Sequence, residues 1–258
     1  MLEADELRGG IILAWQAEAK TDVTLDVPGL SDKKLHPSGD FVGTLSATRD
    51  LTHDIKRVTV ALDRPLKFDA GQYVTLSVPD IWGARAFTDL LFDGKLDGLA
   101  LKVHGPSGNL WLRESRAPMI CIAGGSGLAP LISILQDAAV RSVGRPCVLL
   151  FGARTEADLY AQAEIAAIAR TWNGAFTFVP VLSHEAAGSL WRGDRGLVTE
   201  RIEAHAKALV GADAEAYLCA PPARIDAAIP VLAALGLLGP NIHFDKLLDG
   251  SHGLHRNG

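Results

Sequence analysis

The stretch MICIAGGSGLAPLISIL (119–135) decides the fold of the second half of the chain. Its first five residues are an unbroken apolar run, and apolar residues recur at helical spacing after Pro130. Gly124, Gly125 and Gly127 lie between the two and permit a sharp turn and a close approach to a ligand, because they carry no Cβ. The stretch therefore predicts a buried strand that turns directly into a helix.

Pro130 falls in the first turn of the expected helix, where its missing N–H is harmless. The free N–H groups of that turn would receive an anion such as a dinucleotide pyrophosphate, with Ser126 inside the loop. The spacing is neither GxGxxG nor a P-loop, and Leu128 excludes a nucleophile elbow. A tight strand-to-helix turn without any ligand remains the alternative on the glycines alone.

The same alternation of strand and helix continues to the end of the chain. Expected strands are MICIA (119–123), CVLLFG (147–152), FTFVPV (176–181), AYLC (216–219) and NIHF (241–244). Helical stretches follow the first four, at 131–140, 156–170, 198–209 and 223–235. This pattern predicts a doubly wound α/β domain with a five-stranded parallel sheet.

The preceding part has a different period. Short alternating runs separated by glycines predict the strands of a small antiparallel β-barrel at 41–47, 55–62, 73–78, 99–105 and 110–113. We therefore expect a barrel over 41–116 and the α/β domain over 117–258, joined by a polar linker (29–40) to an N-terminal segment (1–28).

Composition excludes several classes of protein. A formal net charge of −5 without a basic stripe argues against nucleic-acid binding. The uncharged stretch 117–136 contains three glycines and two prolines, which would break backbone hydrogen bonding within a bilayer, so no membrane association is expected. Three scattered cysteines and an acidic start without a signal peptide indicate the cytoplasm. No spacing of histidines, cysteines or carboxylates predicts a metal site.

Read in order, eight segments resemble the ferredoxin–NADP reductase superfamily, in particular the reductase component of phenol hydroxylase, toluene or methane monooxygenase-type oxygenases. They are GQYVTLSVP (71–79), RAFT (85–88), HGPSGNLWLR (104–113), AGGSGLAP (123–130), LLFGARTEADLY (149–160), RGLVTE (195–200), AYLCAPP (216–222) and IHFDK (242–246). The resemblance implies an FAD-binding barrel followed by a nicotinamide-binding domain.

It also implies roles for single residues. Arg85 matches the arginine that approaches the flavin phosphate, Phe87 an aromatic against the isoalloxazine, and Thr88 a hydroxyl near flavin N5. Cys219 matches a cysteine beside flavin and nicotinamide, so Thr88 and Cys219 are the expected catalytic residues. The residues expected to bind the nicotinamide cofactor are Gly124, Gly125, Ser126, Gly127, Arg154, Cys219 and Pro221.

Arg154 and Thr155 follow the second strand of the α/β domain, near the expected adenosine ribose. With Asp158 downstream, the resemblance favours NADH, although an arginine there would also suit the 2′-phosphate of NADPH.

Three departures from the family qualify these expectations. The N-terminal segment resembles the end of a ferredoxin-like domain, but Trp15 replaces a cluster cysteine, so no iron–sulfur cluster is expected in this chain. Roughly two dozen residues that would hold the flavin pyrophosphate are missing after Thr88, which predicts weaker or lost FAD binding and an open barrel edge. Ala220 and Leu247 replace a usual glycine and a common aromatic.

The sequence thus predicts a flavin-dependent enzyme that passes electrons from NADH through FAD to an iron–sulfur protein or oxygenase. No acid or base is needed, because the protein brings the rings together and excludes water. Two alternatives remain open: a non-catalytic shortened paralogue that binds a nucleotide or a partner, and a reductase of free flavin.

Overall fold

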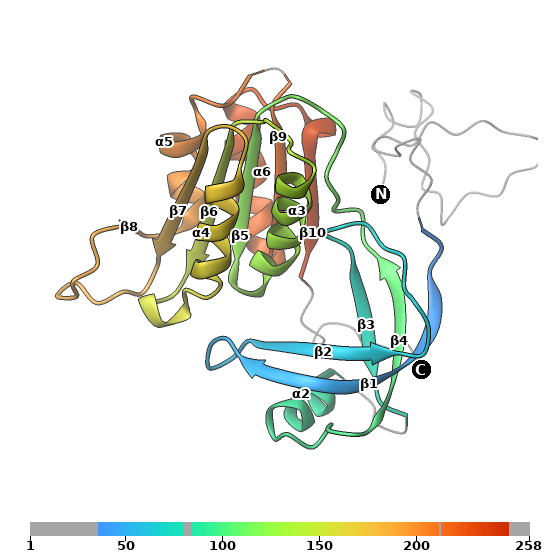
Figure 1. The fold of residues 1–258 in the computed structure, drawn as a ribbon. Coiled ribbons are helices and arrows are strands. Elements are labelled where there is room, and N and C mark those ends of the chain that lie inside the picture. Colours follow the sequence, from blue (N-terminus) through green and yellow to red (C-terminus); the bar gives the residue numbers. More distant parts are fainter. Residues whose placement is uncertain (1–35, 80–83, 212, 248–258) are drawn as a thin grey trace, which may run out of the picture. The chain divides into compact units, whose positions relative to one another are not determined.

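The computed structural model describes residues 36–79, 84–211 and 213–247, drawn as coloured ribbon in Figure 1. All of them belong to one compact unit that begins at Lys34. The expected ferredoxin-like remnant (1–28) and most of the expected linker (29–40) lie outside the described residues.

The first lobe is an antiparallel half-barrel, as the alternating runs predicted. Its strands are β1 (Gly39–Asp50), β2 (Lys56–Leu62), β3 (Tyr73–Ser77) and β4 (Ala100–Ser107), in the spatial order β2-β1-β4-β3. Inward-facing residues alternate with exposed ones along β4, so that Leu101 and Val103 are buried with Leu45 of β1. This small cluster is the core of the half-barrel.

A fifth strand at 110–113 was predicted wrongly. Leu110, Trp111 and Leu112 are buried, but this segment is irregular and pairs with no strand among the described residues. Leu110 and Leu112 pack into the core of the α/β lobe, and the Arg113 N–H donates to the hydroxyl of Tyr217 at 3.0 Å. The apolar alternation here reflects burial against the other lobe, not strand pairing.

A helix, α2 (Ala84–Phe92), lies between β3 and β4 and was not predicted. Phe87, Leu90 and Leu91 are spaced as neighbours on one helix face and pack against Leu45, Leu101 and the rest of the half-barrel core. The expected barrel is therefore a four-stranded sheet whose apolar face is covered by a short amphipathic helix.

The second lobe has the predicted parallel sheet with one addition. The five expected strands are β5 (Met119–Gly124), β6 (Cys147–Ala153), β7 (Phe176–Leu182), β9 (Glu215–Ala220) and β10 (Ile242–Lys246). A sixth strand, β8 (Asp194–Arg195), extends the order to β10-β9-β5-β6-β7-β8. The prediction of five was short by one because β8 has only two residues and both are polar.

Helices cover both faces of this sheet (Figure 1). Leucines and isoleucines of α3 (Leu128–Val140) and α4 (Gln162–Thr171) pack with Cys121, Leu149 and Cys219 on one face. Residues of α5 (Ile202–Ala206) and α6 (Pro222–Ala234) pack with Ile120, Leu150 and Leu218 on the other. Two separate apolar clusters on a fully buried β5 are typical of a doubly wound domain, which confirms the predicted class.

Two further features bear on the expectations. In the described residues no helix is both long and apolar enough to cross a bilayer. Cys121, Cys147 and Cys219 are free and buried.

Candidate functional site at the carboxyl edge of the parallel sheet

The carboxyl ends of β5 and β9 meet where the strand order reverses. From β5 the chain proceeds outward through β6, β7 and β8, whereas β9 and β10 lie on the other side of β5. In open α/β sheets, ligands bind in the crevice outside such a reversal. Gly124–Gly127 lie at and after the end of β5, and Cys219–Pro221 at and after the end of β9, so the structure brings these predicted residues together.

The glycine loop is pressed against β9. A Cβ on Gly127 would overlap the carbonyl oxygen of Cys219, so no other residue fits here without movement of the backbone. Gly125 has a φ of +57°, and a Cβ there would meet nothing within 4 Å. The loop is therefore tight on its inner side and open on its outer side, directly before the first turn of α3.

The hydroxyl of Tyr160 braces this loop by donating a hydrogen bond to the carbonyl oxygen of Gly125 at 3.0 Å. Its ring packs edge-on against Phe151 with centroids 5.6 Å apart. Burial raises the pKa of Tyr160 well above its ordinary value, so the hydroxyl keeps its proton and stays a donor. Sequence reasoning missed Tyr160, although it ends the quoted segment 149–160.

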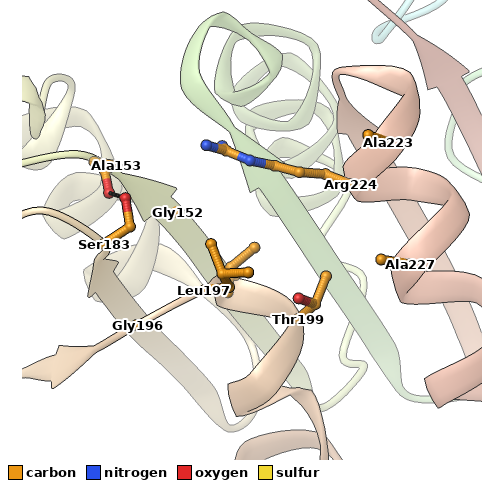
Figure 2. Close-up of a pocket in the computed structure, with 10 residues that line it drawn as sticks. Gly152, Ala153, Ser183, Gly196, Leu197, Thr199, Ala223, Arg224 and Ala227 are labelled. Carbon is orange, nitrogen blue, oxygen red and sulfur yellow. Dashed lines mark hydrogen bonds between the residues drawn. The ribbon is translucent and has the colours of Figure 1, made fainter.

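A pocket of about 370 Å³ opens on the outer side of the loop. Gly125 and Ser126 line it together with Gly152, Arg154, Asp158 and Arg224, and Asp54 and Ile55 of the half-barrel complete the wall. Arg154, a residue expected to bind the nicotinamide cofactor, is thus part of the wall of this pocket. A second, smaller pocket of about 180 Å³ shares Gly152, Ala153 and Arg224 with the first and continues past Ser183, Leu197 and Thr199 (Figure 2).

Arg224 stands where both pockets meet, and sequence reasoning missed it. It lies on the first turn of α6, and Figure 2 shows its side chain extended along one side of the smaller pocket. A Cβ on Gly124 would come within 2.7 Å of its Nη1, so the glycine leaves room for the guanidinium. Among the described residues no carboxylate pairs with Arg224. The only available signal was a cation two positions after the Pro-Pro pair (221–222).

Cys219 lies at the end of β9 and is buried. Burial, and then the carboxylate of Asp245, raise the pKa of its thiol to about 12, so it is protonated at neutral pH. The parallel register of β10 places Asp245 opposite Cys219. Burial raises the pKa of Asp245 as well, against a hydrogen bond from the Asn109 N–H. Asp245 was not singled out from the sequence, although IHFDK (242–246) contains it.

The residues expected to hold a flavin lie elsewhere. Arg85, Phe87 and Thr88 are on α2 of the half-barrel, and Thr88 is exposed. Phe87 packs against the apolar cluster of the half-barrel rather than lining either pocket. Pro221 precedes the first residue of α6 and is exposed.

The chain is similar to a known family and to several characterised reductase components. The sequence matches the family described as "Oxidoreductase NAD-binding domain" over residues 121–229. It is 32% identical to the xylene/toluene monooxygenase electron transfer component of Pseudomonas putida, over 95% of this chain and 76% of the relative. It is 33% identical to the reductase component of phenol 2-monooxygenase of Pseudomonas sp. strain CF600, over 98% of this chain and 78% of the relative.

A solved structure of a reductase is also similar to this chain. The cytochrome P450 reductase GcoB of Amycolatopsis superposes with a TM-score of 0.75 and 31% identity, over 94% of this chain and 80% of that one. The alignment with the xylene/toluene component runs over 269 positions. Ninety-five per cent of 258 residues is about 245, so some two dozen aligned positions have no counterpart here, a shortfall of the size expected from the sequence.

Proposed function

The chain belongs to the family of NAD(P)H-dependent reductase components of oxygenase systems. We propose that NADH binds at the carboxyl edge of the parallel sheet, and that the electrons from NADH go to an iron–sulfur protein or an oxygenase. As a member of this family it is an NAD(P)H oxidoreductase that passes electrons to an oxygenase partner. The observation that carries the binding site is the glycine loop, closed against Cys219 and open toward a pocket with two arginines.

The residues present fit a dinucleotide. Gly125 leaves the backbone accessible, and the N–H groups at the start of α3 face an anion favourably. Arg224, with no carboxylate partner in the described part of the chain, supplies a full positive charge at the junction of the two pockets. We place the diphosphate between the loop and Arg224 and the adenosine toward Arg154 and the smaller pocket.

The Arg224→Ala variant tests this placement. Loss of a charge-assisted contact to the diphosphate should weaken NADH binding by about 10-fold to 100-fold, since such contacts contribute about 1.5–3 kcal/mol. Binding is measured by calorimetry and by the thermal shift that NADH produces. Arg170→Ala, an exposed residue in the last turn of α4, is the matched control and should bind NADH as the wild type does. Equal affinity of both variants would contradict the placement.

The flavin side of the expected site fits less well. Phe87 is partly buried and packs against the half-barrel core, and it lines neither pocket, so we derive no step through the flavin. In the family, reduced nicotinamide supplies a hydride and the flavin passes electrons on singly. FAD therefore remains a proposal, taken from the family and from the lobe over 41–116. The α/β lobe over 117–258 is the proposed nicotinamide domain.

The absorption spectrum of the purified full-length protein separates the remaining possibilities. A flavin spectrum that bleaches on addition of NADH supports the electron-transfer enzyme. A colourless protein that takes up no FAD but still binds NADH would contradict the electron-transfer enzyme and leave the shortened, non-catalytic paralogue. NADH oxidation that depends on the concentration of added FMN or riboflavin identifies a free-flavin reductase.

The same spectrum tests the expectation that this chain carries no iron–sulfur cluster, since a cluster would add broad visible absorbance. If the spectrum shows no cluster, the iron–sulfur cluster of the electron-transfer chain belongs to the acceptor protein. The three buried free thiols are compatible with the proposed cytoplasmic location.

A further inference from the structure

The turn between β1 and β2, residues 51–55, reaches from the half-barrel to the α/β lobe. Its two ends are apolar: Leu51 and Ile55 pack against the cluster that contains α3 and Cys219. Its backbone is closed by hydrogen bonds from the Leu51 and Thr52 N–H groups to the Ile55 carbonyl, at 2.9 and 3.2 Å. The turn is thus held in place by the packing of Leu51 and Ile55 against the α/β lobe and by its own backbone hydrogen bonds.

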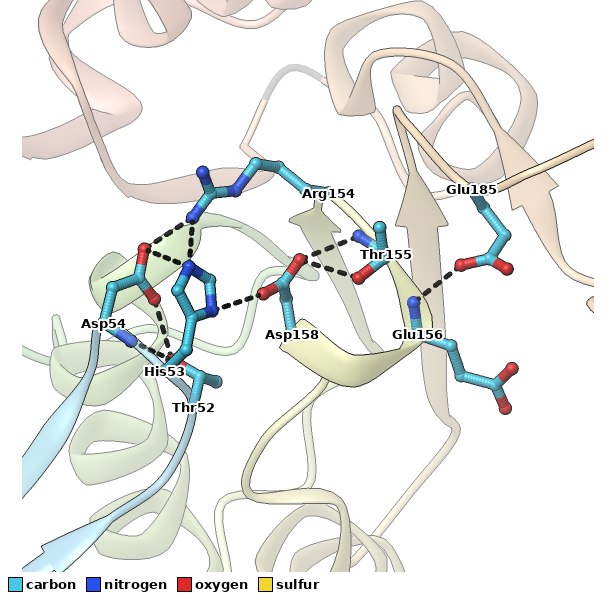
Figure 3. A network of polar contacts seen from close by, with 8 residues as sticks. All are labelled: Thr52, His53, Asp54, Arg154, Thr155, Glu156, Asp158 and Glu185. Atoms are coloured by element: carbon cyan, nitrogen blue, oxygen red, sulfur yellow. Dashed lines mark hydrogen bonds and ion pairs between the residues drawn. The ribbon is translucent and has the colours of Figure 1, made fainter.

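The polar tip of this turn contacts the segment that follows β6 (Figure 3). Arg154 donates to the Asp54 carboxylate, with Nη2 and Oδ2 2.5 Å apart, and the same Nη2 lies 3.3 Å from His53 Nε2. The other ring nitrogen of His53 is 3.4 Å from Asp158 Oδ1. Two residues of the half-barrel therefore surround the arginine that lines the larger pocket.

Asp158 is itself held in place. It accepts hydrogen bonds from the Thr155 N–H and hydroxyl at 2.9 and 3.0 Å. Partial burial alone would raise the pKa of Asp158, but these bonds and the charges of Arg154 and His53 outweigh it and lower the pKa. The carboxylate is therefore charged at neutral pH.

The charges around Arg154 determine which ribose substituent is accepted. An arginine at the end of the second strand would attract a 2′-phosphate, whereas a carboxylate accepts a hydrogen bond from a 2′-hydroxyl. Here two carboxylates, those of Asp54 and Asp158, lie beside the single guanidinium of Arg154. The Arg154 guanidinium also donates a hydrogen bond to Asp54, so it is not free to bind a phosphate. His53, Asp54 and Asp158 lie close enough together to share a metal ion, but the Asp54 carboxylate already accepts a hydrogen bond from Arg154.

We propose that Asp54, a residue of the half-barrel, sets the coenzyme preference of the α/β lobe by holding Arg154 and repelling the 2′-phosphate of NADPH. The inference rests on the proposed binding of a nicotinamide dinucleotide at this edge. Coenzyme choice would then depend on a contact between the two lobes and not on the nucleotide-binding lobe alone.

The test compares Asp54→Asn with the wild type in the full-length protein. Binding of 2′-phosphoadenosine 5′-monophosphate and of AMP is measured by calorimetry. We expect the ratio of the two affinities to move toward the 2′-phosphate by about 10-fold, because one unit charge near the phosphate is removed and Arg154 is released. The ratio of kcat/KM for NADPH over NADH should move in the same direction.

Two further variants make the result specific. Asp54→Glu retains the charge and should restore the wild-type ratio. Asp50→Asn, on the same hairpin but paired with Lys56, should leave the ratio unchanged. In an Arg154→Ala background, Asp54→Asn should produce a much smaller shift, since the released guanidinium is then absent.

An affinity ratio that stays constant in Asp54→Asn, or that shifts equally in Asp50→Asn, overturns this inference while leaving nucleotide binding intact. Wild-type protein that binds neither AMP nor NADH contradicts the proposed function, and this inference with it.

Discussion

At the scale of single residues, Gly127 shows how the site depends on one missing Cβ. A methyl group there would overlap the carbonyl oxygen of Cys219, so the loop or β9 must move. We expect Gly127→Ala to lower the free energy of unfolding by about 1–3 kcal/mol, as overpacking does, and to weaken NADH binding. Urea unfolding measures the first effect. Gly188→Ala, where a Cβ meets nothing within 4 Å, should change stability by less than about 0.5 kcal/mol; equal effects would contradict this explanation.

His243 on β10 is a second residue with a measurable effect. Its buried Nε2 has no hydrogen-bond partner in the described structure, and its ring packs against Tyr217 with centroids 5.2 Å apart. Burial, and then the charge of Arg113, lower the pKa of His243 to about 4. Below its ordinary pKa of 6.5 the unfolded chain binds the proton first, so this contribution to stability is full above pH 6.5 and is lost as the pH falls toward 4.

The variant His243→Phe removes this titration. We expect the free energy of unfolding to fall by about 1–2 kcal/mol less between pH 7 and pH 4 than in the wild type, a value reduced for partial exposure of the ring. Urea unfolding across this pH range measures the difference. Parallel pH profiles of the two proteins would show that His243 is not responsible.

At the scale of elements, α2 covers the apolar core of the half-barrel. Phe87→Ala should lower the stability of this lobe by about 1–3 kcal/mol, because a partly buried aromatic side chain leaves the cluster around Leu101. Asp89→Ala, exposed on the same helix, should have little effect. Thermal unfolding followed by circular dichroism compares the two. A Phe87→Ala protein of full stability but altered flavin absorbance would instead place Phe87 against the flavin.

At the scale of the whole described molecule, the two lobes share a core and ion pairs. Leu51 and Ile55 pack into the larger cluster of the α/β lobe, and Arg57 of β2 pairs with Glu164 of α4 at 2.9 Å. We therefore expect one calorimetric unfolding transition, with equal calorimetric and van't Hoff enthalpies. In Leu51→Ala/Ile55→Ala the transition should broaden or divide. Two transitions in the wild type would mean that the lobes are energetically independent.

Local pattern was sufficient for most elements. The apolar runs at 119–123 and 147–152 identified buried strands because parallel strands are covered on both faces. Local pattern failed at 110–113, where the apolar alternation came from packing against the other lobe. It also failed at 84–92, where a helix stands in place of the part of the barrel that the family resemblance implied. Arg224 and Tyr160 were missed because their roles depend on neighbours far away in the sequence.

The sequence by itself determined the α/β sheet and the glycine loop, since these follow from periodicity and from residues adjacent along the chain, whereas the nucleotide-binding class followed from the resemblance to a known family. Only the tertiary structure decided that Phe87 packs against the half-barrel core, that Arg224 stands at the junction of two pockets with no carboxylate partner in the described part of the chain, and that Asp54 holds Arg154. Residues 54 and 154 meet because the β1–β2 turn packs against the second lobe. No local sequence pattern predicts a contact between residues that are 100 positions apart.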